Sequence, residues 1–149
     1  MSYKSLSEFK NDLSEVRDKS RIIKAKSKSL ETLREDKLAT VYSGAIDYSK
    51  ERLQTSSDPD KALIYVIDEI DRDAEKLIRQ IEKLKEEIAP TVELIEKRMD
   101  IGGEILRLYF LEGLRMVEVA KRVSYSESRT WEIWRKTIRD IYEKEFNKP

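Results

Sequence analysis

Apolar residues recur along the first third of the chain in alternating steps of three and four. This spacing is a heptad repeat, which places its apolar positions on one stripe of a helix. Two positions of the stripe hold serine, which weakens its apolar character. The pattern predicts one long helix over residues 5–38. Its stripe consists of Leu6, Phe9, Leu13, Val16, Ser20, Ile23, Ser27 and Leu30.

A second and cleaner stripe follows a predicted break over residues 42–60. The break holds turn formers, among them Gly44 and a Ser/Thr cluster, and we expect Asp58 to cap the next helix with Pro59 at its first position. Two long helices with matched stripes predict an antiparallel hairpin or coiled coil. Because such a pair buries only a narrow stripe, we expect a homodimer to cover the remainder. The second stripe consists of Leu63, Ile67, Ile70, Ala74, Leu77, Ile81, Leu84 and Ile88.

Pro90 interrupts the second stripe near its end. Proline cannot donate the hydrogen bond that a helix interior requires. We therefore predict that the helix kinks or restarts at Pro90, and that a further helix covers residues 91–99.

A boundary is predicted just after this point. Asp100 is followed by the pair Gly102-Gly103, and glycine pairs are typical of breaks between elements. The sequence thus predicts an all-α chain in which a long-helix oligomerisation region, residues 1–99, precedes a C-terminal domain, residues 100–149. Three short helices are predicted in that domain, over residues 104–111, over residues 116–123 and from residue 127 onward.

The last two of these helices have the spacing of a helix-turn-helix. A small residue at Ala120 lets the first helix cross closely over the second, and Val119 and Val123 supply buried contacts. Ser126 is placed to cap the second helix. The same pattern also occurs in ordinary helical bundles, so a bundle without DNA-binding function is an alternative interpretation.

Residues 105–113 (ILRLYFLEG), residues 117–123 (VEVAKRV) and Ser126 resemble region 4 of sigma factors. Over residues 45–142 the chain also resembles the small sigma-like regulators of phages of low-GC Gram-positive bacteria, the ArpU-like and RinA-like late-gene activators. The resemblance implies a transcription regulator that binds a phage promoter or operator, in some members together with RNA polymerase. It also implies a bacterial host cytoplasm as the location.

The chain departs from the sigma pattern at three positions. Arg115 stands where a Ser or Thr often caps the first helix of the pair, and Thr130 replaces a usual Val or Ile on the buried side. Ser124 stands where Gly is frequent. Residues 124–127 also form a possible capping box, so the last helix could begin two residues earlier than Glu127.

The amino-acid composition limits which catalytic and metal-binding groups the chain can offer. The chain has no Cys and no His, which removes thiolate nucleophiles and the commonest general base and metal ligand. Asp68, Asp71 and Glu75 share one helical face and could bind a metal, but a solvated acidic stripe is the favoured interpretation. We therefore expect neither an enzyme nor a cofactor. No segment reaches the roughly 18 apolar residues of a membrane span, so no membrane contact is expected.

Charge is unevenly spread although the formal net charge is zero. Residues 58–98 carry 8 basic and 12 acidic groups, a net of −4, whereas residues 115–139 carry 7 basic and 3 acidic groups, a net of +4. Residues 1–52, with 12 basic and 9 acidic groups, have a net of +3. The positive charge therefore gathers where the helix-turn-helix is predicted, as contact with DNA phosphates requires.

Helical spacing divides the last helix into two faces. The predicted buried stripe is Thr130, Ile133, Trp134, Thr137, Ile138 and Ile141. On the opposite face, the candidates for contacts with base edges are Ser128, Trp131, Glu132 and Arg135. Candidates for phosphate contacts are Arg129, Lys136 and Arg139, together with Arg115, Lys121 and Arg122 around the preceding helix. Packing against the N-terminal helices is an equally good interpretation of Trp131.

Two functions thus remain in competition. The first is a sequence-specific DNA-binding transcription regulator whose partner is double-stranded DNA. The second is a helical interaction module or inhibitor, whose partner is a protein such as RNA polymerase or a host nucleoprotein.

Overall fold

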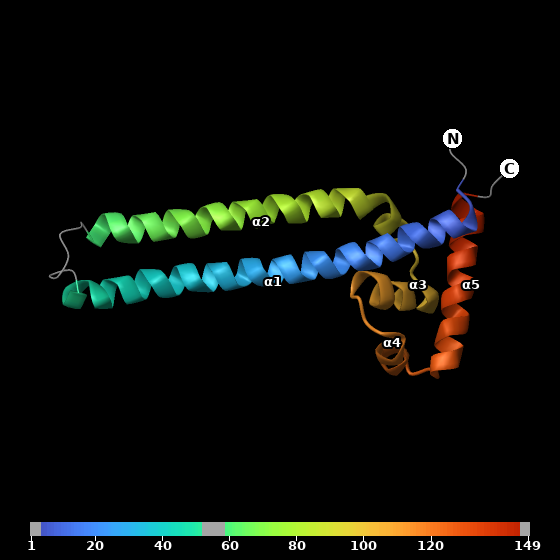
Figure 1. Cartoon of the computed structure of the whole chain (residues 1–149). Helices are drawn as coiled ribbons and strands as arrows, with labels where there is room; N and C mark the ends of the chain where they lie inside the picture. Colours follow the sequence, from blue (N-terminus) through green and yellow to red (C-terminus); the bar gives the residue numbers. More distant parts are fainter. Residues whose placement is uncertain (1–3, 52–58, 147–149) are drawn as a thin grey trace. The chain divides into compact units, whose positions relative to one another are not determined.

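The computed structural model describes residues 4–51 and 59–146, and these residues form helices joined by turns, without a strand. This confirms the all-α prediction. Figure 1 shows the chain order. The elements are α1 (Leu6–Glu51), α2 (Pro59–Glu96), α3 (Ile101–Leu106), the π-helix η2 (Arg107–Leu111), α4 (Met116–Val123) and α5 (Glu127–Glu145). No helix in the described ranges combines the length and the apolar character needed to cross a bilayer.

The chain divides into two compact units. The core unit consists of residues 1–23 and 84–149, and the two-helix unit consists of residues 24–83. Both α1 and α2 contribute to each unit. This division differs from the predicted one after residue 99, because the N-terminal part of α1 and the C-terminal part of α2 supply core to the unit that also holds α3 to α5.

The first long helix continues beyond its predicted end. The prediction stopped α1 at residue 38, whereas the helix runs to Glu51 and includes Gly44. A single glycine costs a helix interior only about 1 kcal/mol relative to alanine, which neighbouring residues can offset. Part of the predicted break is therefore helix, and the predicted cap Asp58 lies outside the described residues. The prediction that Pro59 occupies the first helical position of α2 is confirmed.

The predicted restart at Pro90 is wrong, because α2 continues through this residue to Glu96. Proline in a helix interior costs about 3 kcal/mol. Ile88 and Ile95 flank it and are 6% and 0% exposed, and burying each such side chain contributes about 1.5–3 kcal/mol. Burial on both sides of Pro90 therefore offsets the lost hydrogen bond. The separate helix predicted over residues 91–99 is the end of α2.

The glycine pair lies inside α3, and the predicted break precedes it, because residues 97–100 separate α2 from α3. Asp100 is the N-cap of α3, and its side chain accepts a hydrogen bond from the Gly103 N–H at 3.0 Å. A Cβ on Gly102 would lie 2.1 Å from Thr137 Oγ1, and a Cβ on Gly103 would lie 2.0 Å from the Arg98 carbonyl oxygen. The two glycines thus permit α3 to approach α5 and the connection that follows α2 closely.

Two adjoining clusters form the hydrophobic interior of the core unit. The first gathers side chains from α1, α2, α3, η2 and α5, namely Phe9, Leu13, Val16, Ile88, Ile95, Leu106, Phe110, Ile138 and Ile141. The second joins α3 to α4 through Ile105, Met116 and Val119. The core unit is therefore held together by every helical element of the chain.

The two-helix unit is built differently. Its segments of α1 and α2 run antiparallel, since Lys26 Nζ donates to Gln80 Oε1 at 2.8 Å and Lys37 Nζ lies 2.8 Å from Asp71 Oδ1. Ile81 is the one buried side chain among those described in this unit. The other apolar positions of the second stripe in this unit are half-buried: Leu63, Ile67, Ile70, Ala74 and Leu77.

Candidate nucleic-acid interface

Helix α4 ends in a tight turn. Ser124 has φ 62° and ψ 36°, the left-handed conformation that commonly terminates helices, and both its N–H and that of Tyr125 donate to the Ala120 carbonyl. Ser124 thus adopts the conformation for which glycine is usual at this position. The chain turns away after α4, and three residues separate it from the next helix.

Helix α5 begins at Glu127, as predicted. The Ser126 hydroxyl accepts a hydrogen bond from the Arg129 N–H at 3.1 Å and so caps the helix. The alternative start two residues earlier is wrong, because Ser124 closes the preceding helix. At the N-terminus of α4 the Arg115 side chain makes no cap hydrogen bond, and its Nε lies 3.1 Å from Glu118 Oε1. This helix start therefore lacks the usual Ser or Thr cap.

One face of α5 is buried as the helical spacing predicted. Thr130, Thr137, Ile138 and Ile141 are buried, and Ile133 and Trp134 are half-buried. The two threonine hydroxyls donate at 2.7 Å to carbonyls one turn earlier, those of Ser126 and Ile133. Threonine is therefore tolerated on the buried face, because its hydroxyl finds an acceptor within the helix.

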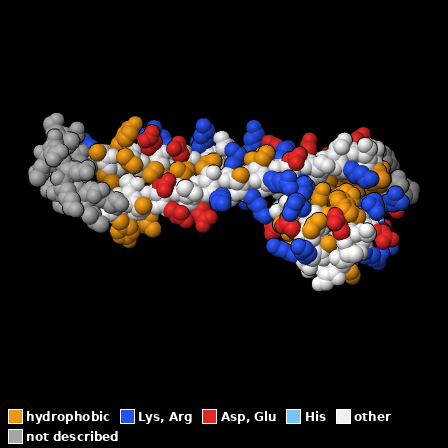
Figure 2. Space-filling model, turned by 60° about the horizontal axis from the view of Figure 1, so that its bottom comes forward, with side chains coloured by type: hydrophobic (Ala, Val, Ile, Leu, Met, Phe, Trp, Pro, Cys, Tyr) orange, Lys and Arg blue, Asp and Glu red, His pale blue; other side chains and the backbone are white. Residues whose placement is uncertain are grey.

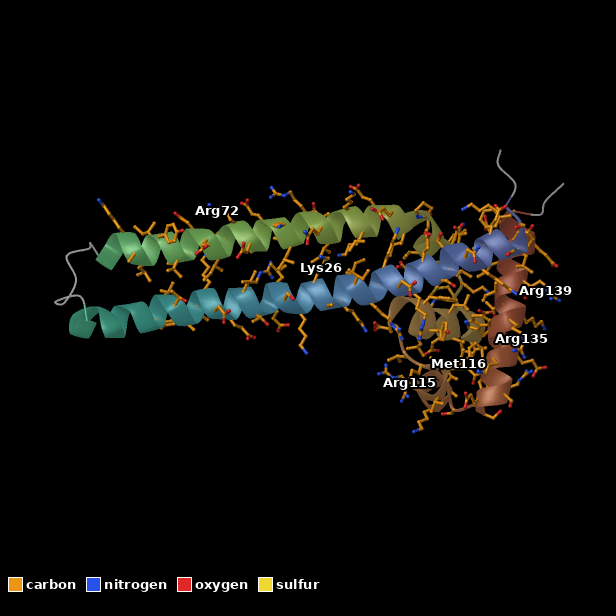
Figure 3. All side chains as sticks on the ribbon, in the orientation of Figure 1. Lys26, Arg72, Arg115, Met116, Arg135 and Arg139 are labelled. Carbon is orange, nitrogen blue, oxygen red and sulfur yellow. The ribbon has the colours of Figure 1, made fainter. Side chains whose placement is uncertain are left out.

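The opposite face of α5 is exposed. Figure 3 shows Arg135 and Arg139 projecting from the side of α5 that faces away from α3. The candidate residues on this face that are exposed are Ser128, Arg129, Glu132, Arg135, Lys136 and Arg139. Of the candidates around α4, Arg115, Lys121 and Arg122 are also exposed. Nine of the ten candidates are thus accessible to a large partner.

Most of the accessible cations have no acidic partner. Arg129 lies 3.2 Å from Glu132, and Arg115 pairs with Glu118, but exposed pairs of this kind contribute little to stability. Within the described residues the remaining cations make no ion pair; they are Lys121, Arg122, Arg135, Lys136 and Arg139. Figure 2 shows Lys and Arg side chains interspersed with Asp and Glu on the face of this unit turned to the viewer.

Trp131 is the candidate that the structure places differently. It is half-buried, with its ring centroid 5.8 Å from that of Tyr109 and 5.1 Å from that of Trp134, both in edge-on geometry. Such aromatic pairs stabilise packing beyond the area they bury. Trp131 therefore packs against Tyr109 of η2 and against Trp134, and this aromatic cluster holds α5 against η2.

Sequence reasoning missed two arginines of α1 that contact η2 and the connection between η2 and α4. Arg17 and Arg21 donate hydrogen bonds to carbonyls of η2 and of the connection that leads to α4. The partners are 92 and 97 residues apart along the chain, so no local pattern announces them.

An ionic cluster fixes the start of α3. Arg98 Nε lies 3.0 Å from both carboxylate oxygens of Asp100, and Arg98 Nη2 lies 3.5 Å from Asp140. The hydrogen bond from Arg98 lowers the pKa of Asp100 below its usual value of 3.8. Its carboxylate therefore stays ionised while it caps α3.

The acidic stripe considered as a metal site is divided. Asp71 pairs with Lys37, while Asp68 and Glu75 are exposed. Throughout the described part of the chain, no three His, Cys, Asp or Glu side chains come together in a way that could hold a metal ion.

Comparisons of the chain with protein-family models, with curated proteins and with solved structures give no match. The resemblance to sigma region 4 therefore rests on the residues of this chain alone.

Proposed function

We propose that the chain is a sequence-specific DNA-binding transcription regulator, in which α4 and α5 act as a helix-turn-helix and α3 completes a three-helix module. The observation that carries the proposal is the exposed face of α5. A helix that begins at a Ser126 cap, directly after a short helix and a tight turn, presents cations that form no ion pair with any described residue of the chain. Helix-turn-helix proteins place such a face in the major groove.

The exposed residues divide by their position along α5. Base edges are read by the first turns of such a helix, which assigns Ser128, Glu132 and Arg135 to base contacts. Arginine can donate two hydrogen bonds to guanine, and glutamate can accept one from cytosine. Phosphate contacts are assigned to Arg129, Lys136 and Arg139 of α5 and to Arg115, Lys121 and Arg122 around α4.

Adequate affinity in this proposal comes from two copies. The net charge of the chain is zero, so non-specific attraction to DNA is weak, and a homodimer that reads two half-sites compensates by avidity. We place the dimer contact on an α1–α2 hairpin, because Leu38, Ile64 and Tyr65 are more than half exposed there. Sedimentation of the full chain tests this, and a monomeric mass at tens of micromolar would contradict it.

The resemblance to phage regulators extends the proposal to the origin of the chain, a phage genome, and to a second partner, RNA polymerase. We infer a phage-encoded regulator that meets RNA polymerase at its promoter. Retention of purified bacterial RNA polymerase by the tagged chain on promoter DNA, but not on scrambled DNA, is the expected result. If RNA polymerase is retained on neither promoter DNA nor scrambled DNA, the proposal is limited to DNA binding.

Selection of duplexes from a random library by the full chain tests the central proposal. Enriched duplexes should bind at least about 10³-fold more tightly than scrambled ones at physiological salt. Arg135→Ala should weaken binding to the enriched duplex by about 1–3 kcal/mol and to the scrambled duplex much less. Lys144→Ala is the matched control, because it removes an exposed cation from α5 outside the proposed face.

The opposite outcomes are equally informative. If Arg135→Ala weakens both duplexes alike, Arg135 contacts phosphate, and base contacts move to Ser128 and Glu132. If no duplex is enriched and none binds at low salt, the DNA-binding proposal is wrong, and the helical interaction module with a protein partner takes its place.

A further inference from the structure

The first helix, α1, makes close contacts with η2 and with the connection between η2 and α4, residues 112–115. Arg17 Nε donates to the Tyr109 carbonyl and Arg17 Nη2 donates to the Leu114 carbonyl, both at 3.1 Å. Its guanidinium carbon also lies 4.1 Å from the centroid of the Tyr109 ring. One turn later on α1, Arg21 Nη2 donates to the Gly113 carbonyl at 3.1 Å. All of these residues belong to the core unit.

These carbonyls lie where the backbone needs outside donors. The last carbonyls of a helix have no partner within it, and η2 ends at Leu111. Gly113 follows with φ 71°, and a Cβ there would lie 3.0 Å from Arg21 Cγ. The connection therefore depends on a glycine for its backbone shape and for room beside Arg21. The two arginines supply charge-assisted hydrogen bonds that hold it in place.

The connection sets where α4 begins. Only Arg115 separates Leu114 from Met116, the first residue of α4, so holding the carbonyls of Gly113 and Leu114 limits how far α4 can shift. Arg17 reaches α5 as well, because the Tyr109 ring beneath its guanidinium packs edge-on against Trp131. Arg17 thus touches the supports of both helices.

We infer that Arg17 and Arg21 are positioning residues for the DNA-reading helices, so that α1 is part of the reading module. Neither residue contacts DNA in this arrangement. They fix the placement of α4 relative to α5, which two rigid helices need in order to contact phosphates and bases together. The DNA-binding test of this inference rests on the proposed function, whereas the test by amide hydrogen exchange does not.

Exchange of backbone amide hydrogens in the DNA-free full chain is the first test. The Glu118 and Val119 N–H groups form the first hydrogen bonds of α4, with the Arg115 carbonyl. Arg17→Ala and Arg21→Ala should speed their exchange. Lys10→Ala, which removes an exposed cation from the same helix, should leave it unchanged. Unchanged exchange in both arginine variants would overturn the inference, whatever the chain binds.

Binding to the enriched duplex is the second test. Arg17→Ala should weaken binding by about tenfold, because the loosened connection must then be ordered when DNA binds. The slope of log affinity against log salt should stay the same, because no phosphate contact is removed. Arg17→Lys should not restore affinity, since lysine cannot span two carbonyls with a planar fork.

Each other outcome has its own meaning. A slope reduced by about one unit, with recovery in Arg17→Lys, would make Arg17 a phosphate contact and overturn the positioning role. A lower melting temperature with unchanged affinity well below it would show a purely structural role and also overturn the inference. If the unmodified chain binds no duplex, the proposed function fails, and the exchange experiment alone decides the positioning role.

Discussion

The core unit and the two-helix unit use the same two long helices, yet they bury side chains very differently. All buried apolar side chains of the described residues lie in the core unit, except Ile81. In the core unit α1 and α2 also pack against α3, η2 and α5. In the two-helix unit each of them packs only against the other, as far as the described residues extend.

Heptad spacing is often taken to determine both which face of a helix is apolar and how completely that face is buried. The two units show that these are separate properties. Leu13 and Ile70 both occupy regular positions of an apolar stripe, but Leu13 is 1% exposed and Ile70 is only half-buried. Spacing determines which face of a helix is apolar. The number of neighbouring elements determines how completely that face is buried. The core unit should therefore hold most of the stability of the chain and open last, whereas the two-helix unit should open first.

Replacing matched isoleucines of α2 should expose this difference most strongly. Ile95→Ala in the core unit removes a side chain that is 0% exposed and should lower the free energy of unfolding by about 2–5 kcal/mol. Ile70→Ala in the two-helix unit should lower it by about 1 kcal/mol, because that side chain is only partly buried in the folded chain. Urea unfolding followed by circular dichroism measures both. Equal losses would break the comparison.

A larger side chain at Ala120, where α4 is buried, should have the next largest effect on stability. Ala120 is 5% exposed, and Ala120→Leu should destabilise the core unit by about 1–3 kcal/mol and weaken DNA binding with it. Val117→Leu on the same helix is the control, since Val117 is 42% exposed and a surface change stays within about 0.5 kcal/mol. Thermal melting and duplex titration check both variants. Unchanged melting and binding in Ala120→Leu would mean that α4 packs in another register.

Acid should weaken the core unit through Asp100. The folded chain lowers the pKa of this carboxyl, so its contribution to stability is fully present above the ordinary value of 3.8 and is lost as pH falls below it through the folded pKa. Asp100→Ala removes the cap of α3 and should cost about 0.5–2 kcal/mol near neutral pH. Its penalty should shrink as pH falls below about 4, because the unfolded carboxyl then binds a proton that the folded carboxyl binds only at lower pH. Melting of both proteins across this range measures the effect, and a penalty independent of pH would contradict it.

Local signals predicted the helices that form the candidate interface. The bounds of α4 and the start of α5 are as predicted, because Ser126 and the apolar spacing act within a few residues of each boundary. Gly44 and Pro90 misled for the opposite reason. As isolated residues they favour breaks, but contacts with distant elements decide whether the helix continues, as the burial of Ile88 and Ile95 beside Pro90 shows.

The residues of the candidate site also fall into two groups: those that helical period predicts and those that depend on contacts with distant elements. The exposed face of α5 follows from helical period alone, and Arg135 and Arg139 lie on it as predicted. Trp131 shares that face in the sequence, but its ring packs edge-on against Tyr109 of η2 and Trp134 and is half-buried. Arg17 could not be found from the sequence, because a hydrogen bond between residues 92 positions apart leaves no trace in either neighbourhood.

The smallest predicted effect tests whether DNA contact, like the buried core, is confined to the core unit. Arg122 of α4 and Arg72 of α2 are both exposed arginines without an ion pair among the described residues, and Figure 3 shows Arg72 on α2. Each phosphate contact releases about one condensed counterion when it forms. Arg122→Ala should therefore reduce the slope of log affinity against log salt by about one unit and should weaken the enriched and scrambled duplexes alike.

Arg72→Ala should leave both affinity and slope unchanged, because the proposal places no DNA against the two-helix unit. Fluorescence anisotropy titrations between about 50 and 200 mM salt, the range over which counterion release changes affinity most, measure both variants. A reduced slope in Arg72→Ala would extend the DNA-binding surface onto the two-helix unit. That unit would then contribute affinity directly, so that avidity from a second copy would no longer be needed to offset the zero net charge of the chain.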